Sequence, residues 1–194
     1  MSEIIITRAG LSNRAFIRSV SERTWPSTYG HIISQEQIDF MLDWMYSDAS
    51  LEKQMNTGCE FYIASKQNDN GDLDPVGFCS VSPAEEKDKL ENSNTHKLNK
   101  LYVLPAAQGT GAGKALLNKA IEVAKAAGST SLFLQVNKQN TAYTFYLKKG
   151  FIKELEFKFD LVFVFLKLVF YLINILSVNM HFQTNRFTFY YFIN

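Results

Sequence analysis

The sequence predicts an α/β fold in which a mixed central sheet is flanked by helices. Short β-branched or apolar runs alternate with segments of helical periodicity, and the order near the middle of the chain is strand, helix, strand, helix with short links. Such an order implies a pair of parallel strands connected through a helix. A length of 194 residues suits one domain with a substantial core.

The first part of the chain predicts one strand and two helices. Residues 4–8, Ile-Ile-Ile-Thr-Arg, are mostly β-branched and predict a strand. We expect Ser12 or Asn13 to cap a helix that stops at Trp25-Pro26. A second helix is expected to begin at Ser34, because Gln37 completes a capping box and apolar residues then recur at helical spacing.

The next segments predict a hairpin and a further strand. Residues 60–66 and 75–83 have strand composition, and Asn70-Gly71 lies in the polar turn between them. Residues 84–96 are polar and predict an exposed loop, and residues 98–103 predict the next strand.

The glycine-rich stretch after this strand predicts an anion site. Gly109, Gly111 and Gly113 stand at every second position, so backbone amides can approach a ligand without interference from Cβ atoms. An amphipathic helix follows over residues 114–127, and its positive end therefore lies at the loop. A phosphate or pyrophosphate is the expected ligand.

Two well-known phosphate loops do not fit this stretch. A P-loop requires a glycine where Gln108 stands and a hydroxyl residue where Ala115 stands. The dinucleotide-binding fingerprint also fails, because the third glycine comes one residue early. What remains is the pattern Gln-x-x-Gly-x-Gly from Gln108 to Gly113.

A second motif lies downstream, after a predicted strand over residues 131–136. Residues 140–151 read Asn-x-Ala-x-x-x-Tyr-x-x-x-Gly-Phe and predict a short helix that ends at Gly150. Together, the two motifs resemble the GCN5-related N-acetyltransferase (GNAT) family over about residues 1–154. The resemblance implies the acyl-CoA N-acyltransferase (GNAT) fold. It also implies acetyl-CoA as co-substrate and direct transfer of acetyl to the primary amine of a small molecule.

The resemblance also implies roles for individual residues. Tyr146 would protonate the departing thiolate, and a merely packed aromatic side chain is the alternative. The strand 98–103 would splay from the strand 131–136, so that a backbone N–H near Val103 polarises the thioester carbonyl. The residues implied to contact the cofactor are Leu101, Tyr102, Val103, Gln108, Gly109, Thr110, Gly111, Ala112, Gly113, Lys114 and Asn140.

The sequence says less about the site that binds the acceptor amine. The aromatic connection 25–31 offers Trp25, Tyr29 and His31 as substrate contacts, and it resembles family members that act on small amines, including polyamines. Amino acids, aminoglycosides and protein N-termini stay open as acceptors. No carboxylate lies on the strand 98–103, and the candidates for the general base are Glu85, Glu86 and His96.

The end of the chain departs from the family pattern. The last 44 residues contain neither glycine nor proline. We therefore divide the chain into an acetyltransferase domain (1–154) and an atypical Phe-rich tail (155–194), whose strands are replaced or divergent. The alternatives are a translated frameshift, a membrane anchor through residues 161–178, or a divergent strand pair. Because the tail is altered, the alternative function is that of a non-catalytic coenzyme A binder or a defunct homologue.

Composition limits the partners. The formal net charge is +1, which does not favour nucleic acid. Cys59 and Cys79 are expected to be buried free thiols, and no metal site is expected. The start of the sequence has no signal-peptide pattern, so a cytoplasmic location is expected, with membrane association only through residues 161–178. A homodimer is compatible with the sequence.

Overall fold

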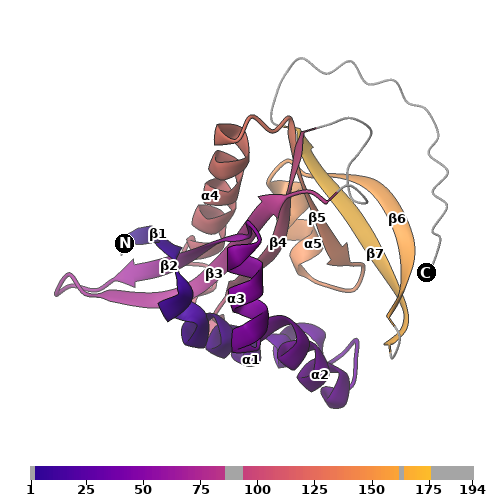
Figure 1. Cartoon of the computed structure of the whole chain (residues 1–194), viewed down its shortest axis with the longest axis horizontal. Coiled ribbons are helices and arrows are strands. Elements are labelled where there is room, and N and C mark those ends of the chain that lie inside the picture. Colours follow the sequence, from indigo (N-terminus) through magenta and orange to yellow (C-terminus); the bar gives the residue numbers. More distant parts are fainter. Residues whose placement is uncertain (1–2, 86–93, 162–163, 176–194) are drawn as a thin grey trace.

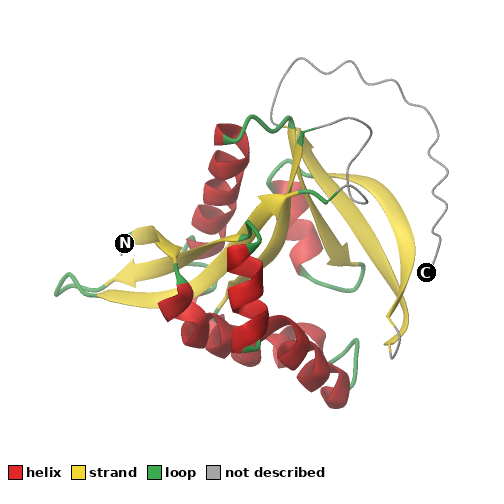
Figure 2. Cartoon of the chain, viewed as in Figure 1, coloured by secondary structure: helices red, strands yellow, loops and turns green. Residues whose placement is uncertain are grey.

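A mixed seven-stranded sheet forms the centre of the molecule, in the order β1-β2-β3-β4-β5-β7-β6 (Figure 1). The computed structural model describes residues 3–85, 94–161 and 164–175. β4 and β5 run parallel and the other neighbours run antiparallel. The strands are β1 (Ile4–Ala9), β2 (Glu60–Gln67), β3 (Leu73–Pro83), β4 (Thr95–Val103), β5 (Ser131–Asn137), β6 (Ile152–Leu161) and β7 (Val164–Ile175). The helices are α1 (Arg14–Tyr29), α2 (Gln35–Tyr46), α3 (Asp48–Asn56), α4 (Ala112–Ala126) and α5 (Ala142–Lys148) (Figure 2).

Two hydrophobic clusters lie on opposite faces of the sheet. One joins the apolar stripe of α4, including Leu116 and Leu117, to Tyr62 and Cys79 of β2 and β3. The other joins α1, α2 and α3 to the alternate strand positions, among them Phe61 and Phe78. The division follows from the period of two along a strand, which sends neighbouring side chains to opposite faces.

The parallel pair β4–β5 is joined only at one end. Its register covers Thr95, His96 and Lys97 of β4 against Ser131, Leu132 and Phe133 of β5, and the pairing stops there. β4 is also irregular on its other side, since Ser80 pairs with Lys100 but Val81 pairs with Leu98. The predicted splay of the two strands is therefore present in the structure.

Most predicted elements are confirmed, and the exceptions have physical causes. α1 does not stop at Pro26 but continues to Tyr29. A proline inside a helix costs about 3 kcal/mol. Trp25 and Tyr29, whose ring centroids lie 4.7 Å apart, both pack in the cluster with α2 and α3, and this packing favours the continued helix. α3 was not expected, because Leu51 is its only fully buried residue and its periodicity is weak. The expected loop over residues 84–96 ends earlier, since Thr95 and His96 are buried in β4.

The stretch after Leu155 adds strands to the sheet. β7 pairs antiparallel with β5, and β6 pairs antiparallel with β7. Of the alternatives for this stretch, the strand pair is the arrangement that the structure has, and β6 runs across residue 154. Residues 162–163 and 176–194 lie outside the described residues, so the segment 161–178 is only partly described. Within the described part of the chain, no helix has the length and apolar character needed to cross a membrane.

Candidate active site

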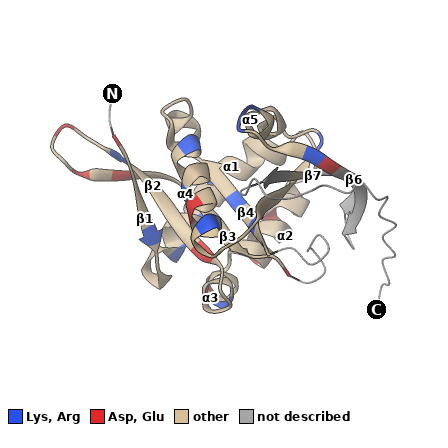
Figure 3. Cartoon of the chain, turned by 90° about the horizontal axis from the view of Figure 1, so that it is seen from above, with Lys and Arg blue, Asp and Glu red and all other residues tan. Residues whose placement is uncertain are grey.

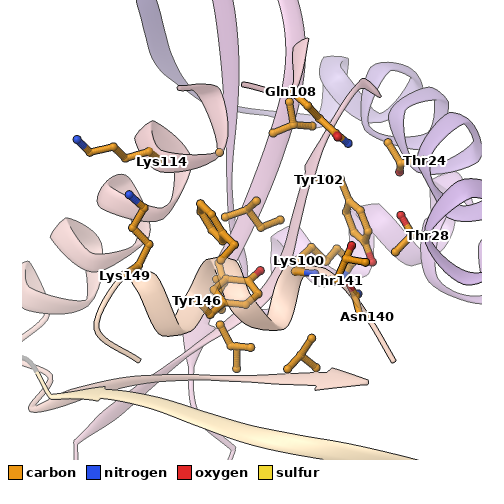
Figure 4. Close-up of a pocket in the computed structure, with 18 of the residues that line it drawn as sticks. Thr24, Thr28, Lys100, Tyr102, Gln108, Lys114, Asn140, Thr141, Tyr146 and Lys149 are labelled. Atoms are coloured by element: carbon orange, nitrogen blue, oxygen red, sulfur yellow. Dashed lines mark hydrogen bonds between the residues drawn. The ribbon is translucent and has the colours of Figure 1, made fainter. Parts of the chain in front are cut away.

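A cavity of about 680 Å³ lies where β4 and β5 separate. Side chains and backbone from α1, β4, the loop before α4, β5 and α5 line it (Figure 4). The cavity therefore collects residues from both predicted motifs, although they are far apart in the sequence.

The glycine loop forms one end of the cavity. Gly109 has φ 80° and Gly111 has φ 95°, which only glycine adopts without strain. A Cβ atom built at either position meets no heavy atom within 4 Å, so the backbone faces open space there. Gly111 is the N-cap of α4, and the first amides of that helix have no intrahelical acceptor. These amides and the helix dipole provide a site for an anion.

Three lysines add positive charge at the same end. Lys114 lies in the first turn of α4, and Lys148 and Lys149 end α5 or follow it. In Figure 4, Lys114 and Lys149 lie on the side of α4 and α5, away from Thr24 and Thr28 of α1. The basic end of α5 is also seen in Figure 3. Lys148 and Lys149 were not predicted from the sequence, because lysines at the end of a helix are common there for their interaction with its dipole.

The splayed half of β4 forms the centre of the cavity. Leu101, Tyr102 and Val103, which are predicted to contact the cofactor, all line it. Their position depends on Gly77 of β3, because a Cβ atom at Gly77 would lie 2.5 Å from the carbonyl oxygen of Tyr102. Only glycine allows this close approach of the two strands.

Tyr146 lines the cavity from α5 and is buried. Its ring makes edge contacts with Phe145 and Phe151, with centroids 5.3 Å and 5.7 Å away. Burial raises the pKa of the Tyr146 phenol well above its usual value, so the group carries its proton at neutral pH. Asn140 lies at the start of the same helix, where its Oδ1 accepts a hydrogen bond from the amide of Ala142 at 2.8 Å. Asn140 thereby fixes the helix that carries Tyr146.

Of the residues predicted to contact the cofactor, two do not line the cavity. Gln108, Gly109, Gly111, Gly113, Lys114 and Asn140 line the cavity. Thr110 does not, since its Oγ1 donates to the carbonyl of Ala107 at 2.7 Å. Ala112 does not either, because its side chain is buried in the core under α4.

The α1 side of the cavity carries the aromatic residues. Tyr29 lines the cavity, and its hydroxyl lies 3.3 Å from that of Tyr102. Trp25 packs behind Tyr29 and does not line the cavity. His31 is exposed and outside the lining, with Nε2 3.4 Å from the carbonyl oxygen of Gln139. Of the three predicted substrate contacts, only Tyr29 reaches the cavity, while Thr24, Ser27 and Thr28 line it unpredicted.

Lys100 is a further lining residue that sequence reasoning missed. Its residue surface is 7% exposed, and Nζ lies 2.5 Å from Oε1 of Gln54. The ammonium group also lies over the rings of Tyr46 and Phe61, 5.6 Å and 5.7 Å from their centroids. Burial lowers the pKa of Lys100 to about 8. The signal in the sequence was a lysine between the apolar residues Leu98 and Leu101 of a predicted strand.

Neither of the two candidate bases that the structure describes, Glu85 and His96, lines the cavity. Glu85 is exposed after β3, and Glu86 lies outside the described residues. His96 is buried at the start of β4, where Nδ1 lies 2.6 Å from Oγ of Ser129, and burial lowers its pKa. Among the described residues that line the cavity there is no Asp or Glu.

Comparisons with known proteins agree with this geometry. The chain is 28% identical over 136 residues to an uncharacterised N-acetyltransferase of Mycobacterium bovis, which covers 70% of this chain and 80% of that protein. It is 27% identical over 143 residues to the uncharacterised N-acetyltransferase YuaI of Bacillus subtilis, covering 74% of this chain and 77% of that protein.

Solved structures share the fold. The PaiA N-acetyltransferase of Thermoplasma acidophilum, in complex with coenzyme A, superposes with a TM-score of 0.67 at 24% identity, covering 87% of this chain and 98% of that chain. YncA of Salmonella typhimurium, solved with its cofactor acetyl-CoA, gives a TM-score of 0.62 at 18% identity, covering 94% of this chain and 99% of that chain. The sequence profile of the Acetyltransferase (GNAT) family matches residues 17–151, more than half of the chain. The chain therefore belongs to the GNAT family and is an acetyl-CoA-dependent N-acetyltransferase.

Proposed function

We propose that the protein transfers the acetyl group of acetyl-CoA to the primary amine of a small molecule by direct attack, with Tyr146 as the general acid. The observation that carries this proposal is the position of Tyr146. Its protonated phenol lines the same cavity as the splayed half of β4 and the glycine loop before α4. The division into a domain over residues 1–154 and a tail over residues 155–194, and a cytoplasmic location, belong to the same proposal.

The described residues fit a coenzyme A thioester. The open backbone at Gly109 and Gly111, the first amides of α4 and the three lysines offer donors and positive charge to the phosphate groups. The part of β4 that does not pair with β5, residues 98–103, has backbone groups available to an extended ligand arm. Acetyl-CoA supplies an acyl group on a thiolate leaving group.

Two groups of the protein then take part in the transfer, a backbone amide and the Tyr146 phenol. An amide N–H near Val103 donates to the acetyl oxygen and stabilises the charge that develops on it. The neutral amine attacks the acetyl carbon, a C–N bond forms, the C–S bond breaks, and Tyr146 gives its proton to the sulfur. Since the described lining holds no carboxylate, the nitrogen loses its proton to solvent, and the Tyr146 phenolate takes up a proton from solvent, which restores the acid.

The acceptor wall is made of Tyr29, Tyr102 and the hydroxyl residues of α1. The aromatic faces support the polyamine-like acceptor that the sequence suggests, because a cation is attracted to an aromatic ring. A polyamine-binding site would also be expected to supply carboxylates, and the described lining supplies none.

Two measurements test the proposal. Isothermal titration with acetyl-CoA is expected to give stoichiometric binding, and absence of binding would contradict it. Thiol release from acetyl-CoA is then followed with a panel of amines. Binding without turnover of any amine would support the alternative, a non-catalytic coenzyme A binder.

A further inference from the structure

We propose that the acceptor carries a carboxylate as well as its amine, and that Lys100 binds this carboxylate. The inference rests on the proposed function, since it names the class of amine that the same cavity takes. It follows from the hydrogen bonds and charges around Lys100.

Lys100 has unused hydrogen-bond donors. A lysine ammonium group has three N–H donors, and the structure gives Nζ one acceptor, Oε1 of Gln54. Gln54 carries no charge, and its own amide nitrogen donates to the carbonyl of Met45 and to Oγ of Ser50. Among the described residues no carboxylate lies within ion-pair distance of Lys100. A buried cation without a counter-ion is costly unless a ligand supplies the opposite charge.

The side chains next to Lys100 include two neutral hydroxyl groups, and neither of them pairs with its ammonium group. Ser80 lies directly opposite Lys100 in the β3–β4 register, and its buried hydroxyl has no hydrogen-bond partner. The ring of Tyr46 lies under the ammonium group, and its buried hydroxyl also has no partner. Among the described residues only Gln54 accepts a hydrogen bond from Lys100, whereas a bound carboxylate would bring several acceptor sites and the opposite charge.

Lys100 lies in a different part of the cavity from the other three lysines. Lys114 lies in the first turn of α4, after the glycine loop, and Lys148 and Lys149 lie at the end of α5, where phosphate groups are expected. Lys100 comes from β4 and extends to the α1–α3 face of the sheet, the face that also carries Tyr29 and Tyr102. An acceptor with one carboxylate and one amine matches this arrangement, because its carboxylate meets Lys100 while its amine faces the splayed strand. A polycation would meet a positive group instead.

The test compares matched acceptors with the full-length protein. We would measure kcat/KM for β-alanine against propylamine, L-methionine against 3-(methylthio)propylamine, and L-phenylalanine against phenethylamine, with spermidine as a polyamine. For at least one pair, the carboxylate-bearing member is expected to react about 10- to 100-fold more efficiently, as a hydrogen bond between charged groups would give.

Substitution of Lys100 tests its part in this preference. Lys100→Met is expected to abolish the difference within the preferred pair by raising KM for the acid, while the Kd for acetyl-CoA stays unchanged. Lys97→Met is the control, since Lys97 is in the same strand but does not line the cavity, and it is expected to keep the preference. If Lys100→Met does not fold, the wild-type comparison decides alone.

Three results would overturn the inference. Amines without a carboxylate, or spermidine, reacting as well as the acids would refute it and leave the proposed function standing. A Lys100→Met variant that slows both members of each pair equally would give Lys100 a purely structural role. Absence of turnover with every amine would refute the inference together with the proposed function.

Discussion

The hydroxyl oxygens of Tyr29 and Tyr102 lie 3.3 Å apart and join α1 to the splayed half of β4. The contact links the helical wall of the cavity to the strand at its centre. Burial raises the pKa of both phenols well above the usual value, so both are protonated and one donates to the other at neutral pH.

We predict that Tyr29→Phe weakens acceptor binding. Tyr29 lines the cavity, so without its hydroxyl the acceptor loses one hydrogen-bonding group worth about 1 kcal/mol, which corresponds to a roughly fivefold higher KM. The KM for acetyl-CoA should not change, and steady-state kinetics with each substrate varied in turn measures both values. Tyr62→Phe is the matched control, because its hydroxyl bonds to Glu60 at 2.7 Å outside the cavity. An equal effect of the two variants would contradict the assignment.

Tyr146→Phe is expected to lower kcat by about 10²- to 10⁴-fold, the usual contribution of a general acid. The Kd for acetyl-CoA should stay the same, which titration calorimetry would show. Because burial raises the pKa of Tyr146, the wild-type rate should not fall through loss of its proton up to about pH 10, the ordinary value. Tyr143→Phe is the control, since Tyr143 is on the same helix but does not line the cavity. A Tyr146→Phe variant as fast as the wild type would remove Tyr146 from the mechanism.

Gly111→Ala is expected to weaken both the fold and the cofactor site. A left-handed conformation costs a non-glycine residue about 1–2 kcal/mol, and the new methyl group would project into the open loop. Gly58 offers a matched comparison, because its φ is 91° and a Cβ atom there also meets nothing within 4 Å, but it does not line the cavity. Thermal unfolding should show similar losses for Gly111→Ala and Gly58→Ala, whereas only Gly111→Ala should raise the Kd for acetyl-CoA. A raised Kd in both variants would mean that strain alone explains the effect.

The buried Lys100 predicts a pH-dependent stability. Burial lowers its pKa to about 8 in the folded protein, the Cys59 thiol opposes this shift and Lys97 adds to it. The unfolded chain has the ordinary lysine pKa of about 10.4 and binds more protons between these values. The free energy of unfolding should therefore rise with pH from about 8 to 10 in the wild type relative to Lys100→Met. Urea unfolding at several pH values measures this difference, and parallel curves for the two proteins would contradict it.

Local patterns in the sequence predicted most of the fold. The capping box of Ser34 and Gln37 is present, with the Gln37 amide 3.3 Å from Oγ of Ser34. Gly128 and Gly150 adopt positive φ after their helices, as a C-terminal cap requires. These features depend on residues close together in the chain, so the sequence is enough to predict them. The predicted end of α1 at Trp25-Pro26 was wrong, because the tertiary packing of Trp25 and Tyr29 favours a longer helix.

The candidate site was predicted less completely, for a related reason. The glycine loop and Tyr146 lie in motifs whose spacing can be read from the chain. The environment of Lys100 could not be predicted, because it is formed by Gln54, 46 residues earlier in the chain, and by the aromatic rings around the ammonium group. His96 looked like a candidate base because of its residue type, but its position at the paired end of β4 ties it to Ser129. No spacing rule brings such distant partners together.

The separation of the hydrophobic residues into two clusters has a consequence for how the protein can change. The cluster under α4 supports the glycine loop, and the cluster under α1, α2 and α3 supports Tyr29 and Lys100. Substitutions more than about 7–10 Å apart without shared partners have nearly additive effects. The sheet therefore lets one side keep a constant coenzyme while the other is remodelled for a new amine, and acceptor preference can diverge without the loss of donor binding.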